Sequence, residues 1–350
     1  MKNWIARLFG GRGRDVPEAS VEAGGASSAR APSASPSSIA SSSPSTAQAA
    51  EPPASARDPI LDFWHWLTAG AASAAAVPTA QALPRARHVL AELERLATNP
   101  TDAAGLVPRV PEVIPQLLRS LRDEAASSAA LAQQVARDPA LVAELIREAN
   151  SPYYRASSQV RTIDAALLVL GRNGLRMLLA RAAFRPLIGM QGGRHTRQAG
   201  PRIWRHTELC AQAAGLLAPG LGADPFEAYL AGLMGDLGLI VALRLFDGML
   251  ESDALPQDPD FVAALLARTR TLAARIALQW ELPPPVAAAI MGAGGDGPSA
   301  GQPLAAALGR AEGLARLALM ADEGMLAADD PAIAGLDAAS GRVLERLVRL

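Results

Sequence analysis

The stretch EAYLAGLMGDLGLIVALRLF, residues 227–246, decides the fold class of this chain. Its apolar residues continue on both sides of a short Gly-Asp-Leu-Gly break at 235–238, and alanine and leucine outnumber β-branched residues. Just before it, Asp224 supplies an N-cap and Pro225 a residue suited to the first helical position, and Glu227 follows three residues after the cap. The stretch therefore predicts buried helix on both sides of a tight turn.

The composition of the whole chain favours helix in the same way. Half of the 350 residues are hydrophobic and only 4% are aromatic, so the chain can bury a large core made mostly of alanine and leucine. Both residues are strong helix formers, and β-branched residues rarely cluster. We therefore predict an all-α protein.

Charge and cysteine content exclude several functional classes. The 33 basic residues are balanced by 34 acidic ones, so the chain lacks the positive excess on which nucleic-acid binding draws, and we expect no nucleic-acid partner. The single cysteine, Cys210, excludes an internal disulfide and a thiolate metal site, which fits a reducing cytoplasm. Neither a secretory signal nor a membrane-spanning apolar run is evident, so the predicted location is cytoplasmic, with no transmembrane segment.

Apolar residues at helical spacing predict further helices outward from the central stretch. Thr162 caps a helix that ends at Gly171, and the chain restarts into a second helix after Asn173. Residues 189–201 are rich in Gly, Arg and Gln, which predicts an exposed connection between two helical subdomains. The other predicted helices lie at about 86–97, 111–121, 127–135, 139–149 and 203–217.

The first 57 residues divide into two segments. Residues 1–15 form a short basic segment whose apolar face predicts contact with a partner groove or an anionic membrane surface. The alternative is a short helix, or a frayed end, that covers its own domain. Residues 16–57 are mostly Ala, Ser, Pro and Gly, which predicts a disordered linker. The apolar face of the first segment carries Trp4, Ile5, Leu8 and Phe9.

Residues 58–104 predict a helical lead-in to the main domain, and residues 301–350 predict C-terminal helices that pack on it. The lead-in begins with the densest aromatic cluster of the chain, which includes Phe63, Trp64 and Trp66. Such a cluster either packs a helix on its own domain or, where it is exposed, marks a partner contact. The sequence leaves both interpretations open.

Three segments together resemble the HDOD family, the HD-related output domains of bacterial signalling proteins. The resemblance runs from about residue 106 to residue 293, within a domain that we place at 105–300. It implies an all-α regulatory module in two helical subdomains, which acts through contacts with other signalling proteins. The segments are RDPALVAELIREANSPYY at 137–154, TIDAALLVLGRNGLRMLL at 162–179 and EAYLAGLMGDLGLIV at 227–241.

The catalytic relatives of this family hold divalent metals through a His on one helix, a His-Asp pair on another, and further residues downstream. The resemblance places His206 at the first position, but Gly235 stands where the pair has its His, and only Asp236 remains. Thr269 stands at a downstream His position. One imidazole and one carboxylate do not make a credible metal site, because metal hydrolysis needs several converging ligands.

We therefore predict a non-catalytic protein with no metal and no cofactor, in which these four positions are vestigial. His206 is then a satisfied, half-buried histidine and Asp236 a carboxylate of the helix turn. The alternatives are a degenerate HD-type phosphohydrolase that uses His206 and Asp236, and a sensor that binds a small ligand or nucleotide in the vestigial pocket.

Other chemistries find no support in the sequence. Lys2 is the only lysine, which excludes a phosphate-binding P-loop or a Schiff-base lysine in the domain. The helix corner near Gly171 has only a small basic face, so we do not interpret it as a DNA-reading motif. The remaining histidines have no spacing that would bring two onto one metal, and we predict that they are surface or partly packed residues. They are His65, His88 and His195.

Overall fold

The structure is a computed structural model, and all of its regular elements in the described residues are helices, which confirms the all-α prediction. Predictions for residues 1–57, with Trp4, Ile5, Leu8 and Phe9, and for the helices at 111–121 and 127–135 lie outside the described residues, apart from Val135 itself, which is helical and buried. The described residues are 58–68, 82–99, 135–136, 139–151, 158–189, 192–250, 254–293, 302–327 and 330–348.

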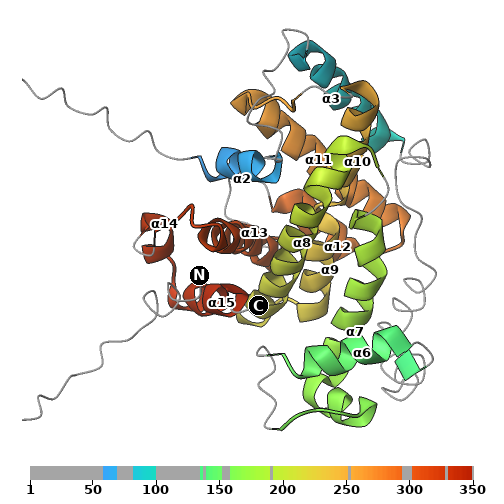
Figure 1. The fold of residues 1–350 in the computed structure, drawn as a ribbon, viewed down its shortest axis with the longest axis vertical. Coiled ribbons are helices and arrows are strands. Elements are labelled where there is room, and N and C mark those ends of the chain that lie inside the picture. Colours follow the sequence, from blue (N-terminus) through green and yellow to red (C-terminus); the bar gives the residue numbers. More distant parts are fainter. Residues whose placement is uncertain are drawn as a thin grey trace, which may run out of the picture. The chain divides into compact units, whose positions relative to one another are not determined.

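The long helix α8, Arg194–Leu221, is the axis of the fold (Figure 1). The helices α9, Pro225–Gly235, and α13, Pro303–Asp322, pack along it, and α10, Leu237–Met249, packs against its first half. Gly232 allows α9 to approach α8 closely, since a Cβ there would lie 2.5 Å from the Cα of Ala211. Small residues therefore set the spacing of the central helices.

A second group of helices packs around α11, Pro259–Gln279. The helix α12, Pro284–Gly292, joins α11 to α13 and α9, while α3, Ala82–Thr98, covers α11 and α10. The α10 and α11 backbones nearly touch at Gly238, where a Cβ would overlap the carbonyl oxygen of Thr269. No larger residue fits at this crossing.

The predicted corner at Gly171 is present as a kink in α7, Ile163–Gly189. Gly171 has φ 64°, a left-handed conformation that favours glycine. The Thr162 Oγ1 accepts a hydrogen bond from the Ala165 N–H at 3.2 Å, as expected for the predicted cap. The helix α6, Pro139–Ala149, packs on α7, and α7 in turn packs on α8 and α9.

The predicted N-cap of α9 is also confirmed. The Asp224 Oδ1 accepts hydrogen bonds from the N–H groups of Phe226 and Glu227, at 2.9 and 2.8 Å. At the C-terminal end, α15, Ala338–Val348, packs on α13 and α8 after the short helix α14, Pro331–Ala334.

The predicted exposed connection at 189–201 is wrong for its second half, because α8 begins at Arg194 rather than near residue 203. His195 and Thr196 are buried, with 6% and 2% of their surface exposed. The side chain of Asp247, at the end of α10, accepts hydrogen bonds from the N–H groups of His195 and Thr196 and from the Thr196 hydroxyl. The cap of this helix therefore comes from a residue far away in the sequence.

The aromatic cluster is part of the protein's own core, so its interpretation as an open partner contact is wrong in this structure. It lies on α2, Pro59–Thr68, where Phe63 is 4%, Trp64 0% and Trp66 8% exposed. The Trp64 Nε1–H donates a hydrogen bond to the Pro256 carbonyl oxygen at 2.9 Å. Burial of three large rings favours packing over exposure.

Within the described residues, one stretch is apolar and long enough to cross a membrane, namely Pro225–Met249, which comprises α9 and α10. Its most apolar part is 83% buried inside the protein. Such burial is what the core helices of a folded domain require.

Candidate functional site

Two of the predicted vestigial residues, His206 and Asp236, lie in a buried polar cluster at the centre of the helices, which we call the His206 cluster. Its members are drawn from four places in the fold: α8, the junction of α9 and α10, α11 and α13. They are His206, Thr207, Cys210, Asp236, Arg270 and Glu312.

Asp236 is the centre of this cluster. Its Oδ2 lies 2.7 Å from His206 Nδ1 and accepts a hydrogen bond from the Thr207 hydroxyl at 2.8 Å. Asp236 stands between α9 and α10, yet its side chain makes no hydrogen bond to the first turn of α10. Its carboxylate therefore binds side chains of α8 and does not cap α10.

The charge state of Asp236 follows from its surroundings. Burial alone would raise its pKa, but the attraction of His206, the hydrogen bonds from His206 and Thr207, and the charge of Arg270 together hold the pKa below the ordinary value. An ionised Asp236 can only accept, so the Nδ1 of His206 carries the proton of this bond. In the neutral imidazole the Nε2 then presents a lone pair.

Arg270 and Glu312 form the second half of the cluster. The two guanidinium nitrogens of Arg270 donate to the two carboxylate oxygens of Glu312, each at 2.8 Å. Glu312 is only 9% exposed, so this bidentate pair is largely withdrawn from water. Our sequence analysis missed it, although a glutamate in the middle of the Ala- and Leu-rich helix α13 is a signal that a buried partner exists.

Cys210 is not equipped as a nucleophile. Its thiol is buried, and burial together with the nearby carboxylates of Glu312 and Asp236 raises its pKa well above the ordinary value. A thiol of this kind stays protonated near neutral pH, and the thiolate is the reactive form.

The residues present do not fit a divalent metal of the kind that the family's catalytic relatives hold. Gly235 offers no ligand, although a Cβ at this position would meet no atom within 4 Å. The Thr269 hydroxyl donates to the Leu266 carbonyl oxygen of its own helix at 2.9 Å. Among the described residues, no group of three or more His, Cys, Asp or Glu side chains is placed to hold a metal ion.

A second buried polar cluster, which sequence reasoning also missed, joins α6, α7 and α8; we call it the Arg181 cluster. The guanidinium of Arg181 lies 2.9 Å from Glu148, 3.3 Å from Glu144 and 4.0 Å from Glu208. Burial raises the pKa of Glu208 even though Arg181, Arg205 and Arg185 oppose the shift.

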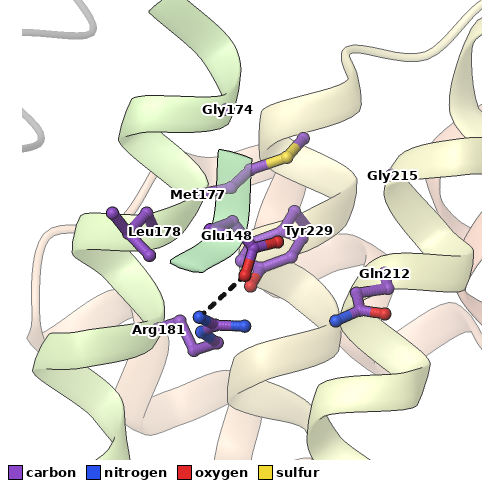
Figure 2. A pocket seen from close by; sticks show the side chains of 8 residues that line it. All are labelled: Glu148, Gly174, Met177, Leu178, Arg181, Gln212, Gly215 and Tyr229. Atoms are coloured by element: carbon purple, nitrogen blue, oxygen red, sulfur yellow. Dashed lines mark ion pairs between the residues drawn. The ribbon is translucent and has the colours of Figure 1, made fainter. Parts of the chain in front are cut away.

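The Arg181 cluster borders a small cavity (Figure 2). The cavity measures about 20 Å³ and is also lined by Gln212 and Tyr229. This volume suits about one water molecule rather than an organic ligand. The cluster is therefore a structural contact between the α6–α7 pair and the core.

The remaining candidate residues lie apart from both clusters. His65 and His88 are exposed, whereas His195 is buried at the start of α8, so the prediction of a surface or partly packed residue is wrong for His195. Arg176, from the small basic face near Gly171, is only 6% exposed. Asn150 ties the end of α6 to Val160 through two hydrogen bonds of 2.8 Å, so its side chain shapes the turn after this helix.

Comparisons with known proteins agree with this fold. A family model described as the HDOD domain matches residues 107–293. An uncharacterized protein of Treponema pallidum is 22% identical over 214 residues, which are 58% of this chain. The match spans only 40% of that relative's own length.

Two solved structures share the architecture. A crystal structure of an HDOD domain protein with unknown function from Geobacter sulfurreducens matches with a TM-score of 0.54 and 20% identity, over 73% of this chain and 94% of the other. A protein from Shewanella amazonensis, described provisionally as a metal-dependent phosphohydrolase, matches with a TM-score of 0.53 and 18% identity, over 76% and 99%. At these identities the likeness establishes the fold alone.

Proposed function

Since the HDOD model matches more than half of its length, this chain belongs to the HDOD domain family, and we propose that it is a non-catalytic signalling module. In this proposal the module works in a bacterial cytoplasm and regulates other signalling proteins by binding them. Its single, buried thiol is compatible with that compartment.

One observation carries the proposal: the side chains of the His206 cluster that could bind a metal are already bonded to each other. The imidazole of His206 and the carboxylate of Asp236 are bound to each other at 2.7 Å. Glycine at position 235 removes the imidazole that the catalytic relatives require beside that Asp. A metal would have to compete for a carboxylate that Thr207 also binds, with too few other ligands to replace those hydrogen bonds.

The alternative is a degenerate phosphohydrolase, and one observation keeps it open to test: His206 and Asp236 do lie together in the core. Arg270, which a phosphohydrolase would turn toward a phosphate, is instead paired with Glu312. Among the described residues this site has no metal ligand set, and Arg270 is already paired, which supports the binding role.

Metal analysis and hydrolysis assays on the full chain test the proposal. After incubation with Mn²⁺, Mg²⁺ or Fe²⁺ and desalting, we expect much less than one metal ion per chain. We also expect no turnover of mononucleotides, phosphomonoesters or cyclic dinucleotides.

Two variants sharpen the assay. Gly235→His restores the missing imidazole at a position with open space around its Cβ. A rise in bound metal in this variant alone would show that the missing imidazole at position 235 is what prevents metal binding. Stoichiometric metal and turnover in the wild type, lost in His206→Ala but kept in the exposed control His65→Ala, would contradict the proposal.

A further inference from the structure

The aromatic helix α2 lies over the His206 cluster. The ring of Phe63 is centred 4.6 Å from the imidazole of His206. The helix packs on α8, α11 and α13, which are the helices that contribute His206, Arg270 and Glu312 (Figure 1). The family match begins at residue 107, so α2 lies outside the matched segment, and it covers the part of the domain where His206 lies.

The hold of α2 on the domain is mainly apolar. Trp64 and Leu67 are fully buried. Two hydrogen bonds join α2 to the domain: Trp64 Nε1–H donates to the Pro256 carbonyl oxygen, and Gln257 Nε2–H donates to Thr68 Oγ1 at 3.2 Å. The start of the helix is encoded locally, since the Asp58 Oδ1 accepts from the Ile60 N–H at 2.9 Å.

This interface leaves polar atoms unsatisfied on both of its sides. The Nε2 of His206 on the domain side and the Nε1 of Trp66 on the α2 side are buried without a hydrogen-bond partner. The Trp66 ring does receive the guanidinium of Arg202, which lies 5.7 Å from its centre. Because a buried polar group without a partner carries a desolvation penalty, α2 is an imperfect occupant of this surface.

We propose that the surface beneath α2, formed by α8, α11 and α13, is the docking surface of this module, and that α2 occupies it until a partner helix displaces it. The inference rests on the proposed binding function. The partner is a helix that presents apolar rings in the manner of Phe63 and Trp64. It binds more tightly than α2 if it offers a hydroxyl or amide group that forms a hydrogen bond with His206 Nε2.

The size of α2 suits such an exchange. A helix of 10 residues is marginal in water by itself, so α2 depends on this surface for its structure. Residues 69–81 join it to α3, so it remains attached to the chain after release. A tethered segment competes with a free one at a high effective concentration, which lowers the apparent affinity of any partner in the wild-type chain.

A labelled peptide of residues 58–68 tests the proposal by fluorescence anisotropy on the full chain. In the variant Phe63→Ala/Trp64→Ala the chain's own α2 is weakened, and we expect the peptide to bind it at least about tenfold more tightly than it binds the wild type. A peptide with Trp64→Ala is expected not to bind. The chain variant His65→Ala changes an exposed residue of the same helix and is expected to behave as the wild type.

A reversible lock gives a second measurement, which does not depend on the double variant folding. Thr68→Cys/Gln257→Cys places one thiol on α2 and one just before α11, at two positions whose native side chains are in contact through Thr68 Oγ1 and Gln257 Nε2. We expect the oxidised form to bind the peptide less than the reduced form does. Equal peptide binding by the oxidised and reduced forms, or no binding by a released chain that still melts cooperatively, would overturn the proposal.

Two peptides test the role of His206, one with Phe63→Gln and one with Phe63→Leu. The two side chains are similar in size, but only glutamine offers an N–H to Nε2. We expect the Gln peptide to bind more tightly, whereas a purely apolar surface prefers leucine, and that result would exclude recognition by His206. Turnover in the hydrolysis assay would overturn the proposed function while leaving these peptide results unchanged, so the two failures are distinguishable.

Discussion

Two partly buried arginines, Arg270 and Arg181, are neutralised in different ways. Arg270 meets one carboxylate, Glu312, in a bidentate pair with both hydrogen bonds at 2.8 Å. Arg181 stands among three carboxylates, whose side chains keep between 16% and 24% of their surface exposed. In the first arrangement one positive and one negative charge cancel, and Glu312 is largely withdrawn from water. In the second, three carboxylates surround one guanidinium beside a small cavity.

The difference shows how burial and charge balance act together. A buried charge is tolerated when its partner is matched in geometry and number. In the second cluster burial raises the pKa of Glu208, with Glu148 as a smaller contributor, even though Arg181, Arg205 and Arg185 oppose the shift. The two clusters should therefore respond differently to mutation and to pH.

The largest effect is expected at the bidentate pair of Arg270 and Glu312. Arg270→Met leaves Glu312 buried without its partner, and we expect a loss of about 3–5 kcal/mol in the free energy of unfolding, measured by urea denaturation. The double variant Arg270→Met/Glu312→Leu should recover most of this loss, because no charge then remains buried.

An exposed ion pair serves as the control for that experiment. Arg310 and Asp337 lie 3.3 Å apart with about half of each side chain exposed. Arg310→Ala should change stability by less than about 1 kcal/mol. Equal losses of stability in Arg270→Met and Arg310→Ala would show that the buried pair contributes no more to stability than the exposed pair.

A smaller effect is expected in the Arg181 cluster. Arg181→Met should lower the free energy of unfolding by about 1–3 kcal/mol, because water reaches the three carboxylates and they can take up protons. Glu144→Gln alone should have less effect, since Glu148 still pairs with Arg181 at 2.9 Å. If Glu144→Gln lowered the free energy of unfolding as much as Arg181→Met, the interpretation that three carboxylates jointly neutralise Arg181 would be contradicted.

The smallest effect is a dependence on pH that has opposite signs in the two clusters. The pKa of Glu208 is raised from its ordinary value of 4.5, so between that pH and the folded pKa only the folded chain keeps the proton, and stability falls as pH rises. The loss caused by Glu208→Gln should therefore shrink as pH rises through this window.

Asp236 gives the reverse case. Its pKa is lowered from the ordinary value of 3.8, so its ionised form contributes stability above that pH, and the contribution is lost as pH falls through the folded pKa. The loss caused by Asp236→Asn should therefore grow as pH rises from the acid side. Urea titrations of both variants between about pH 3 and pH 7 measure the two slopes. Slopes of the same sign would contradict the assigned charge states.

The helices that local signals encode could be predicted from the sequence. The cap at Asp224 and the corner at Gly171 depend on neighbours in the chain, and each has the predicted role. The start of α8 could not be predicted in this way, because its cap is Asp247, about fifty residues further on.

The candidate site shows the same limit. The resemblance marked His206 and Asp236, but it did not reveal that they bind each other, nor that Phe63 covers them. Thr269 was expected among them, yet its hydroxyl returns to its own helix. Partners chosen by tertiary packing leave no periodic signal in the sequence.

Because the carboxylate of Asp236 bonds to α8 instead of the first turn of α10, the reversal between α9 and α10 has an order of formation. A locally capped turn can close early, whereas the side chain of Asp236 gains its hydrogen bonds only after a segment about thirty residues upstream has arrived. Docking of α9 on α8 should therefore precede closure of the reversal, and substitutions at Asp236 should speed unfolding more than they slow refolding.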